Sequence, residues 1–269
     1  MRVDARTFYS LDRQFSCSAA YIEPDRYRQL EELPQSGSLI ARGAGLSYVP
    51  ASFGTKSLSL GFSKFDRILS FNGEVIEVEA GISLHKLHLF LTPKGLRVPI
   101  EPGHPQITIG GCIAFNVFGK NQFREGFFEK CVEEIELFHP NKGYVVCSRQ
   151  QNKSLFELTC GGMGLTGIIV KAKIRLSRIP SPWVLVTKIP VKNLKHMVEV
   201  MLREQSTADA LYSFNDFTSF GSDLGGGFVI TSKFSQDATV PKALLEFKSL
   251  ERRQTHAPGL FNAITRPAF

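Results

Sequence analysis

Three segments of the chain gather glycines, and such clusters let backbone N–H groups approach an anion without interference from side chains. They are residues 42–48, 103–121 and 161–167. Residues 162–167 of the third segment fit the pattern G-x-G-x-x-G. In a doubly wound dinucleotide-binding fold this pattern opens a helix. Here the residues that follow, 168–176, alternate between apolar and polar over most of their length, which is typical of a strand. We therefore expect a loop that enters a sheet.

All three glycine segments lie at the edges of expected strands. If they converge in space, their backbones could cradle a long cofactor that carries a diphosphate in its middle. Each segment taken alone is better explained as a tight turn. The spacing of glycines by itself leaves both interpretations open.

Composition narrows the classes of protein to consider. The chain has 269 residues and a formal net charge of +7, but its Lys and Arg residues are scattered, so we expect no nucleic-acid partner. No apolar run approaches the roughly 20 residues of a membrane span. Charged residues near the start and five irregularly spaced cysteines favour a cytoplasmic protein with reduced thiols. His85 and His88 lack further ligands nearby, so we expect no metal site.

Periodicity and turn residues predict an α+β fold. Strands are expected at 20–24, 38–42, 57–60, 75–80, 135–138, 144–147, 168–176, 183–189, 210–213 and 227–233. Helices are expected at 26–33 with Asp25 as N-cap, from Ser83 to Leu91, and at 194–204, while 99–121 is expected to be loop-rich. Pro180 and Pro182 mark a boundary, which gives domains 1–178 and 179–269.

In order and local sequence, the three segments resemble the FAD-binding fold of the vanillyl-alcohol oxidase (PCMH) type. Residues 41–48 look like its pyrophosphate loop, 102–121 like the loop along the flavin, and 160–169 like the loop at the adenine end. Within that family the likeness is to decaprenylphosphoryl-ribose 2′-oxidase-like proteins. The resemblance implies a two-subdomain PCMH-type FAD-binding domain followed by a partial α+β substrate (cap) domain.

The resemblance also implies roles for individual residues. The implied cofactor-binding residues are Arg42, Gly43, Ala44, Gly45, Leu46, Ser47, Tyr48, Gly103, Thr108, Ile109, Gly110, Gly111, Gly119, Asn121, Gly164, Gly167, Ile168 and Ile169. Lys120 is the implied catalytic residue, because a cation beside the flavin would stabilise the reduced anionic ring or hold a substrate oxygen. Phe118, Lys120 and Ser213 are the implied substrate contacts.

Three departures from the family pattern matter. Leu46 stands where some relatives carry the histidine that attaches FAD covalently, so we expect non-covalent FAD. Phe118 stands where the sugar oxidases have a histidine, which replaces a polar contact near the flavin by an apolar one. The last residues, 258–269, resemble a stretch in the middle of the substrate domain, so the family's C-terminal tyrosine and lysine are missing from this chain.

The leading hypothesis is an FAD-dependent oxidoreductase that oxidises a CH–OH group of a sugar or polyprenyl-sugar by hydride transfer to flavin N5. The resemblance further implies a short-chain reductase as partner. One alternative is a catalytically inactive flavin-binding protein or half of a split enzyme. Another is an aldonolactone or alditol oxidase, although the missing anchor histidine counts against the alditol version.

Overall fold

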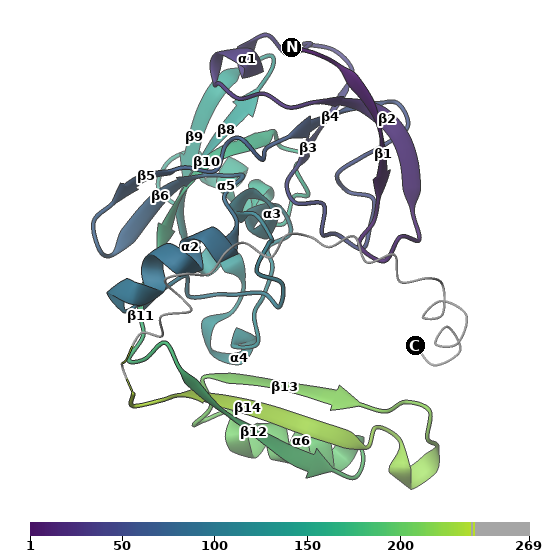
Figure 1. Ribbon diagram of the computed structural model, residues 1–269, viewed down its shortest axis with the longest axis vertical. Coiled ribbons are helices and arrows are strands. Elements are labelled where there is room, and N and C mark those ends of the chain that lie inside the picture. The colour runs from purple at the N-terminus through teal and green to yellow at the C-terminus, as the bar shows by residue number, and fades with distance from the viewer. Residues whose placement is uncertain (238, 240–269) are drawn as a thin grey trace. The chain divides into compact units, whose positions relative to one another are not determined.

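The computed structural model describes residues 1–237 and 239, and it is a mixture of helices and strands of the α+β class (Figure 1). The chain divides into two compact units, Met1–Arg178 and Ile179–Phe269. Among the described residues, the first unit contains a four-stranded, a five-stranded and a two-stranded sheet, and the second unit contains one three-stranded sheet. Each unit is described below by itself.

The first sheet of the first unit has the strand order β1-β2-β4-β3. Its strands are β1 (Asp4–Tyr9), β2 (Ser16–Ile22), β3 (Ser38–Arg42) and β4 (Ser57–Gly61). β1 and β2 form an antiparallel hairpin, whereas β4 runs parallel to both β2 and β3. The short helix α1 (Arg28–Glu31) connects β2 to β3.

The prediction that Asp25 caps this helix was wrong. The N-cap position falls on Tyr27, which makes no side-chain cap hydrogen bond. The backbone N–H of Asp25 instead donates to Oε1 of Gln29 at 2.8 Å, so a helix side chain reaches back to the preceding loop.

The second sheet has the order β5-β6-β10-β8-β9. Its strands are β5 (Ile68–Phe71), β6 (Val75–Glu79), β8 (Val132–His139), β9 (Gly143–Ser148) and β10 (Ile168–Arg175). The middle strand β10 is antiparallel to both β6 and β8. Apolar and polar residues alternate along β10 because its two faces differ. Ala172 and Ile174 are buried, whereas Lys171 and Lys173 pair with glutamates of β8 at 2.6 and 2.9 Å.

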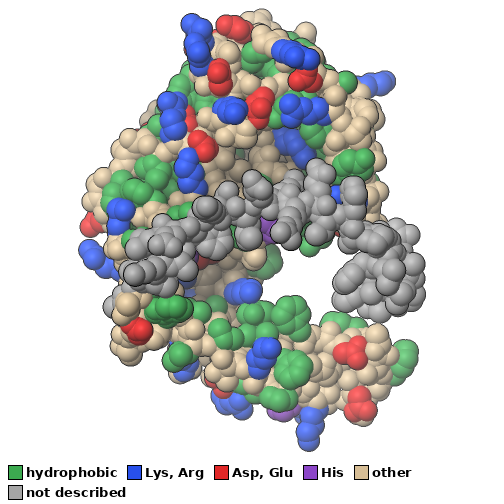
Figure 2. Space-filling view, in the orientation of Figure 1, with side chains coloured by type: hydrophobic (Ala, Val, Ile, Leu, Met, Phe, Trp, Pro, Cys, Tyr) green, Lys and Arg blue, Asp and Glu red, His purple; other side chains and the backbone are tan. Residues whose placement is uncertain are grey.

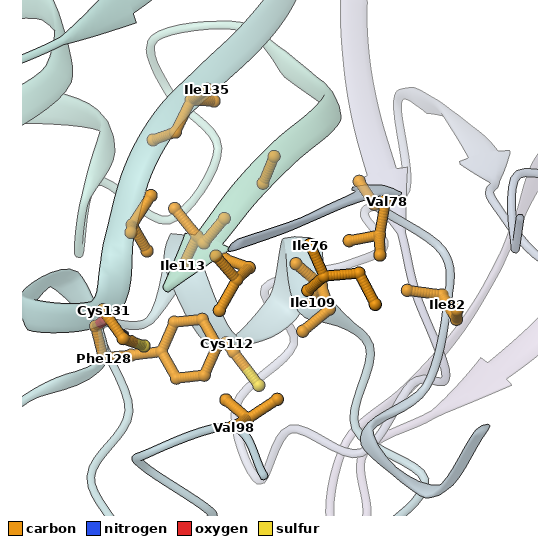
Figure 3. Packing of buried hydrophobic residues seen from close by; sticks show 14 of the residues in the cluster. Ile76, Val78, Ile82, Val98, Ile109, Cys112, Ile113, Phe128, Cys131 and Ile135 are labelled. Atoms are coloured by element: carbon orange, nitrogen blue, oxygen red, sulfur yellow. Dashed lines mark hydrogen bonds between the residues drawn. The ribbon is translucent and has the colours of Figure 1, made fainter. Parts of the chain in front are cut away.

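Helices cover this sheet and complete the core. α2 (Leu84–Leu91) begins as predicted at Ser83, whose Oγ accepts from the Lys86 N–H. The remaining elements are η1 (Thr92–Lys94), β7 (Leu96–Arg97) paired with β11 (Ser177–Arg178), α3 (Ile109–Ala114), α4 (Gln122–Glu125), η2 (Phe128–Cys131) and α5 (Lys153–Thr159). α3 lies inside the segment expected to be loop. It forms because Ile109, Cys112 and Ile113 enter the main apolar cluster (Figure 3).

In its described residues, the second unit is a three-stranded antiparallel sheet with one α-helix and one short 3-10 helix. Its elements are β12 (Val184–Val191), α6 (Leu194–Glu204), β13 (Ala210–Asn215), η3 (Gly221–Asp223) and β14 (Gly227–Phe234), and the sheet order is β12-β14-β13. Val200 of α6 packs with Leu211 and Val229 on one face. The alternate residues, including Phe214 and Phe228, remain exposed, and hydrophobic side chains are visible on the surface of this unit (Figure 2).

In the part of the chain that the structure describes, no helix is both long enough and apolar enough to cross a membrane.

Candidate functional site

A cavity of about 600 Å³ lies within the first unit, and all three glycine segments contribute to its wall. This volume falls within the range of small-molecule and cofactor sites. The expected site residues that line it are Arg42, Gly43, Ala44, Gly45, Leu46, Ser47, Tyr48, Thr108, Gly110, Gly111, Gly164, Gly167 and Ile169. Segments that are up to 120 residues apart in sequence therefore meet at one site.

The first segment leaves β3 as an open loop. Its carbonyls are partly used: the Arg42 carbonyl accepts from Phe62 N–H at 3.0 Å, and the Ser47 carbonyl accepts from Leu11 N–H at 2.9 Å. The six N–H groups of residues 43–48, by contrast, donate no hydrogen bond to the part of the chain that the structure describes. A run of such donors on a cavity wall is the arrangement that binds phosphate oxygens.

Two glycines of this loop allow close approaches that a side chain would prevent. Gly45 has φ +68°, and a Cβ there would lie 2.2 Å from Nη2 of Arg42. A Cβ on Gly43 would lie 2.3 Å from Oγ1 of Thr108. The first contact locates the Arg42 guanidinium directly against its own loop. The second shows that the first and second glycine segments touch one another.

The second segment uses its N–H groups within the fold. Thr108 caps α3, because its Oγ1 accepts from the Gly111 N–H at 3.2 Å. The N–H of Ile109 donates to the Ile82 carbonyl and that of Gly110 to the Ala80 carbonyl, at 2.9 and 2.8 Å. Gly110 and Gly111 therefore present a surface without side chains to the cavity, which suits a flat ring more than an anion.

The third segment closes the cavity wall from the end of α5. Met163 N–H donates to the Ala114 carbonyl at 2.8 Å, which attaches this loop to the C-terminal end of α3. Met163, Gly164 and Gly167 have φ values of +52°, +82° and +142°. Leu165 at the tip is 91% exposed, so the loop offers an apolar side chain to whatever occupies the cavity.

Arg42 is the only Lys, Arg, His, Asp or Glu among the described residues that line the cavity. Its Nη1 donates to Oγ of Ser52 at 2.6 Å, and Cζ lies 4.6 Å from the ring centroid of Phe8. With no carboxylate on the wall, the cavity favours an anionic ligand.

A buried carboxylate supports the floor of the cavity next to Ala80. Glu79 is fully buried and receives hydrogen bonds from Arg67 Nη2 at 2.7 Å, Arg67 N–H at 2.8 Å and Tyr27 Oη at 2.5 Å. Burial opposes ionisation of Glu79, but these hydrogen bonds outweigh it and lower the pKa of its carboxyl. Burial and the same carboxylate raise the pKa of Tyr27.

Several expected site residues lie away from the cavity wall. Ile109 and Ile168 belong to the apolar cores, and Nδ2 of Asn121 donates to the Pro99 carbonyl at 2.7 Å. Gly119 is buried, and a Cβ on it would lie 2.7 Å from the Glu101 carbonyl oxygen, whereas Gly103 is exposed. The roles of these residues stay predictions.

The residues expected to contact substrate also lie outside the wall. Phe118 is 56% exposed and packs edge to face on Phe127 with centroids 5.9 Å apart. Lys120 is exposed, and Ser213 lies on β13 in the second unit. Their catalytic and substrate roles stay predictions.

Sequence reasoning missed a set of lining residues that are mostly apolar. They include Ser52, Phe62, Ala80, Ile107, Ala114, Phe115, Val117, Met163 and Leu165. Val117 and Phe115 stand within the second glycine segment, so their position in the chain could have indicated them. Phe62 and Ala80 carry no such signal, because only the packing of β4 and β6 brings them to the cavity.

The cysteines near the site are not activated thiols. Burial raises the pKa of Cys112 well above its ordinary value, with a smaller contribution from Cys131. Burial likewise raises the pKa of Cys160 to about 12. Both thiols stay protonated at neutral pH and act as small packing residues.

Comparison with known proteins agrees with this geometry. Residues 30–148 match the family model described as the FAD binding domain. This stretch of the chain is thus similar to FAD-binding domains of the PCMH type, and FAD is the cofactor of that family. The matched stretch contains the first two glycine segments, while the third lies just beyond it.

Three related proteins are similar to parts of this chain. The chain is 37% identical to the decaprenylphosphoryl-beta-D-ribose oxidase of Mycolicibacterium smegmatis over 143 residues, 52% of this chain and 31% of the relative. It is 26% identical to an uncharacterized protein of Streptomyces coelicolor over 181 residues, 66% and 48% of the two chains. It is also 26% identical to the D-lactate dehydrogenase of Anaerostipes hadrus over 147 residues, 52% and 30%. The chain therefore spans about a third to a half of these relatives.

Proposed function

We propose that this chain binds FAD non-covalently in the cavity of its first unit and serves the oxidation of a CH–OH group on a sugar or polyprenyl-linked sugar. The observation that carries the proposal is the run of N–H groups at residues 43–48, which make no hydrogen bond within the described chain and stand beside Arg42. A diphosphate would satisfy these donors, and Arg42 adds a positive charge on the same wall.

The cavity residues fit the parts of FAD by their chemistry. Residues 43–48 and the Ser47 hydroxyl would hold the diphosphate, and Gly110 and Gly111 would lie against the flavin. Gly164, Gly167 and Ile169 would hold the adenine end. When bound, the flavin supplies a hydride acceptor at N5. Leu46 offers no atom for a covalent bond to the cofactor, so the protein would hold FAD by non-covalent contacts alone.

The substrate side of the proposal rests on the likeness to the sugar oxidase of Mycolicibacterium smegmatis. In this proposal, Lys120 of the present chain would hold a substrate oxygen or the reduced flavin ring. Phe118 and Ser213 would contact the substrate. The second unit, residues 179–269, would act as the cap over the substrate, and a short-chain reductase would take the oxidised product. Other relatives are named for lactate and cytokinin, so the FAD-binding region alone is compatible with several substrates.

A second candidate function is flavin binding without turnover, or one half of a split enzyme. The composition of the cavity wall favours it: among the described lining residues no Asp, Glu or His is present to take the hydroxyl proton. In this version the missing base comes from another polypeptide or the reaction is not performed.

One set of measurements separates these functions. The purified chain should show flavin absorbance and release all of its flavin on acid precipitation. Reduction of the bound flavin under anaerobic conditions by aldose or polyprenyl-phosphoryl sugar substrates would support oxidation. Flavin that binds but is never reduced by any of them would favour the second function. A colourless chain that takes up no added FAD would contradict both.

A further inference from the structure

The N-terminal hairpin, β1 and β2 with their turn (residues 4–22), lies before the stretch that matches the FAD-binding family. It is nevertheless in contact with the first glycine loop at two places. The proposed FAD site assigns no role to this hairpin, and the two contacts point to one.

The first contact is made through Arg42. Its guanidinium lies over the ring of Phe8 at 4.6 Å and near that of Phe53 at 5.8 Å, within the range of cation–π contacts. Phe8 and Phe53 are themselves stacked, with ring centroids 6.0 Å apart and an interplanar angle of 21°. Both rings are buried, at 6% and 5% exposure, in a small cluster that includes Tyr21. The aromatic pair therefore fixes the plane on which the Arg42 side chain rests.

The Arg42 side chain in turn determines the path of the loop. Its Nη1 donates to Ser52 Oγ at 2.6 Å, at the far end of the loop region. Gly45 packs so closely on the guanidinium that no Cβ could be accommodated. The guanidinium therefore packs directly on the backbone at Gly45.

The second contact is a backbone hydrogen bond. The N–H of Leu11, in the hairpin turn, donates to the Ser47 carbonyl at 2.9 Å. The turn is closed by Arg13 N–H donating to the Ser10 carbonyl at 3.0 Å. The hairpin thus holds the glycine loop near both ends, at Arg42 and at Ser47, while the N–H groups between them stay available to a ligand.

We propose that the N-terminal hairpin preorganises the diphosphate-binding loop, with Phe8 and the Leu11 N–H as its positioning groups. The inference rests on the proposed FAD site. A loop already held in its binding conformation loses less conformational freedom when the ligand binds, so its affinity is higher. Neither residue lines the cavity, so both act through Arg42 and the loop backbone.

The test uses the full chain and measures the dissociation constants of FAD and of riboflavin, which lacks the diphosphate. Leu11→Pro removes the N–H, and proline suits this position because Leu11 is the second residue of the turn. Leu11→Ala keeps the N–H and is its matched control. Phe8→Ala removes the ring, Phe8→Tyr keeps it, and Tyr9→Ala changes the neighbouring exposed residue of the same strand.

We expect Leu11→Pro and Phe8→Ala to weaken FAD binding about tenfold, which equals about 1.4 kcal/mol. Riboflavin binding should stay at the wild-type value, a difference that general destabilisation would not produce. Leu11→Ala, Phe8→Tyr and Tyr9→Ala should bind FAD as the wild type does. Wild-type FAD affinity in folded Leu11→Pro would overturn the inference while leaving the FAD site intact. If the wild-type chain bound no FAD, the proposed function and this inference would fall together.

Discussion

The first and second glycine segments look alike in sequence but use their backbones in opposite ways. Residues 43–48 leave their N–H groups without a partner in the described chain, whereas Ile109, Gly110 and Gly111 donate theirs to Ile82, Ala80 and Thr108. One segment keeps hydrogen-bonding capacity for a ligand. The other uses glycine to bring a helix close to a neighbouring turn and to leave a smooth wall.

The comparison shows that glycine content alone does not identify an anion site. What distinguishes the two segments is where their hydrogen bonds go, and only the fold determines that. The second segment is short of side chains because α3 must pass next to Ala80, where a Cβ on Gly110 would lie 3.1 Å from the Ala80 Cβ. The first is short of side chains because the loop must fold around Arg42.

The sharpest test of this contrast is Gly45→Ala. The change forces a Cβ against Arg42 at a φ of +68°, so the loop must open and its N–H groups diverge. We expect FAD affinity to fall about a hundredfold, equal to about 2.7 kcal/mol, by fluorescence titration. Gly143→Ala is the matched control, since Gly143 has the same φ of +68°, a Cβ there meets nothing within 4 Å, and the residue does not line the cavity. A folded Gly45→Ala protein with wild-type affinity would contradict the role of this loop.

A second test concerns the support beneath the second segment. Glu79→Gln removes the charge that Arg67 and Tyr27 bind, and we expect the free energy of unfolding at pH 7 to fall by about 2 kcal/mol in urea denaturation. Arg67 is 61% exposed on its side chain, so water can solvate it after the change, which keeps the loss moderate. Glu77→Gln, on the same strand, is the matched control and should cost little.

The ionised carboxylate of Glu79 should also make the stability of the protein depend on pH. The folded-state pKa of Glu79 lies below its ordinary value of 4.5, so its contribution is complete above that value and is lost as pH falls through the folded-state pKa. The wild type should therefore lose its advantage over Glu79→Gln as the pH falls from 4.5 through the lower, folded-state pKa. A stability difference that stays constant down to pH 2 would be inconsistent with an ionised Glu79.

A smaller effect should reveal the contact between the two segments. Gly43→Ala places a Cβ 2.3 Å from Thr108 Oγ1, whereas Thr108→Ala removes that oxygen along with the cap of α3. Each single change should destabilise the protein, and the double variant should be less unstable than the sum by about 1 kcal/mol. Thermal unfolding of the four proteins gives the coupling. Strict additivity would mean that the segments do not touch in solution.

The smallest effect is expected for Gly110→Ala. The contact with Ala80 is tight, but alanine is the better helix former, so the two terms oppose each other. We expect a change in stability below about 1 kcal/mol. Because the added Cβ would lie against Ala80, we expect FAD affinity to stay within about twofold of the wild type even though Gly110 lines the cavity. Comparison with Gly45→Ala on one titration series would show whether the loops differ in function as they do in hydrogen bonding.

Much of the fold could be predicted from the sequence where the pattern was local. The Ser83 cap, the helix at 194–204 and the strands at 135–138 and 144–147 were confirmed, because capping residues and periodicity act over a few positions. β1 was missed, because its residues DARTFY do not alternate and it is held by pairing with β2. α3 was missed because two glycines conceal a helix that burial of its apolar residues stabilises.

The sequence allowed us to predict which segments form the candidate site, but not which contacts its side chains make. The glycine patterns indicated which backbones would line a cavity, and all three do. They could not indicate that Asn121 would turn inward to the Pro99 carbonyl, or that Phe8 would come to lie beneath Arg42. Those contacts depend on pairings between distant strands, which carry no local signal.

The position of β10 in the middle of its sheet has a consequence for biosynthesis. β6 and β8 are made early, yet the strand that joins them, Ile168–Arg175, follows the stretch that matches the family. Until that strand leaves the ribosome, the nascent chain carries two open edges, and such edges attract other chains. A fragment cut at the family boundary would keep this defect permanently. We therefore expect such a fragment to aggregate, because the strand that would cover both edges is missing from it.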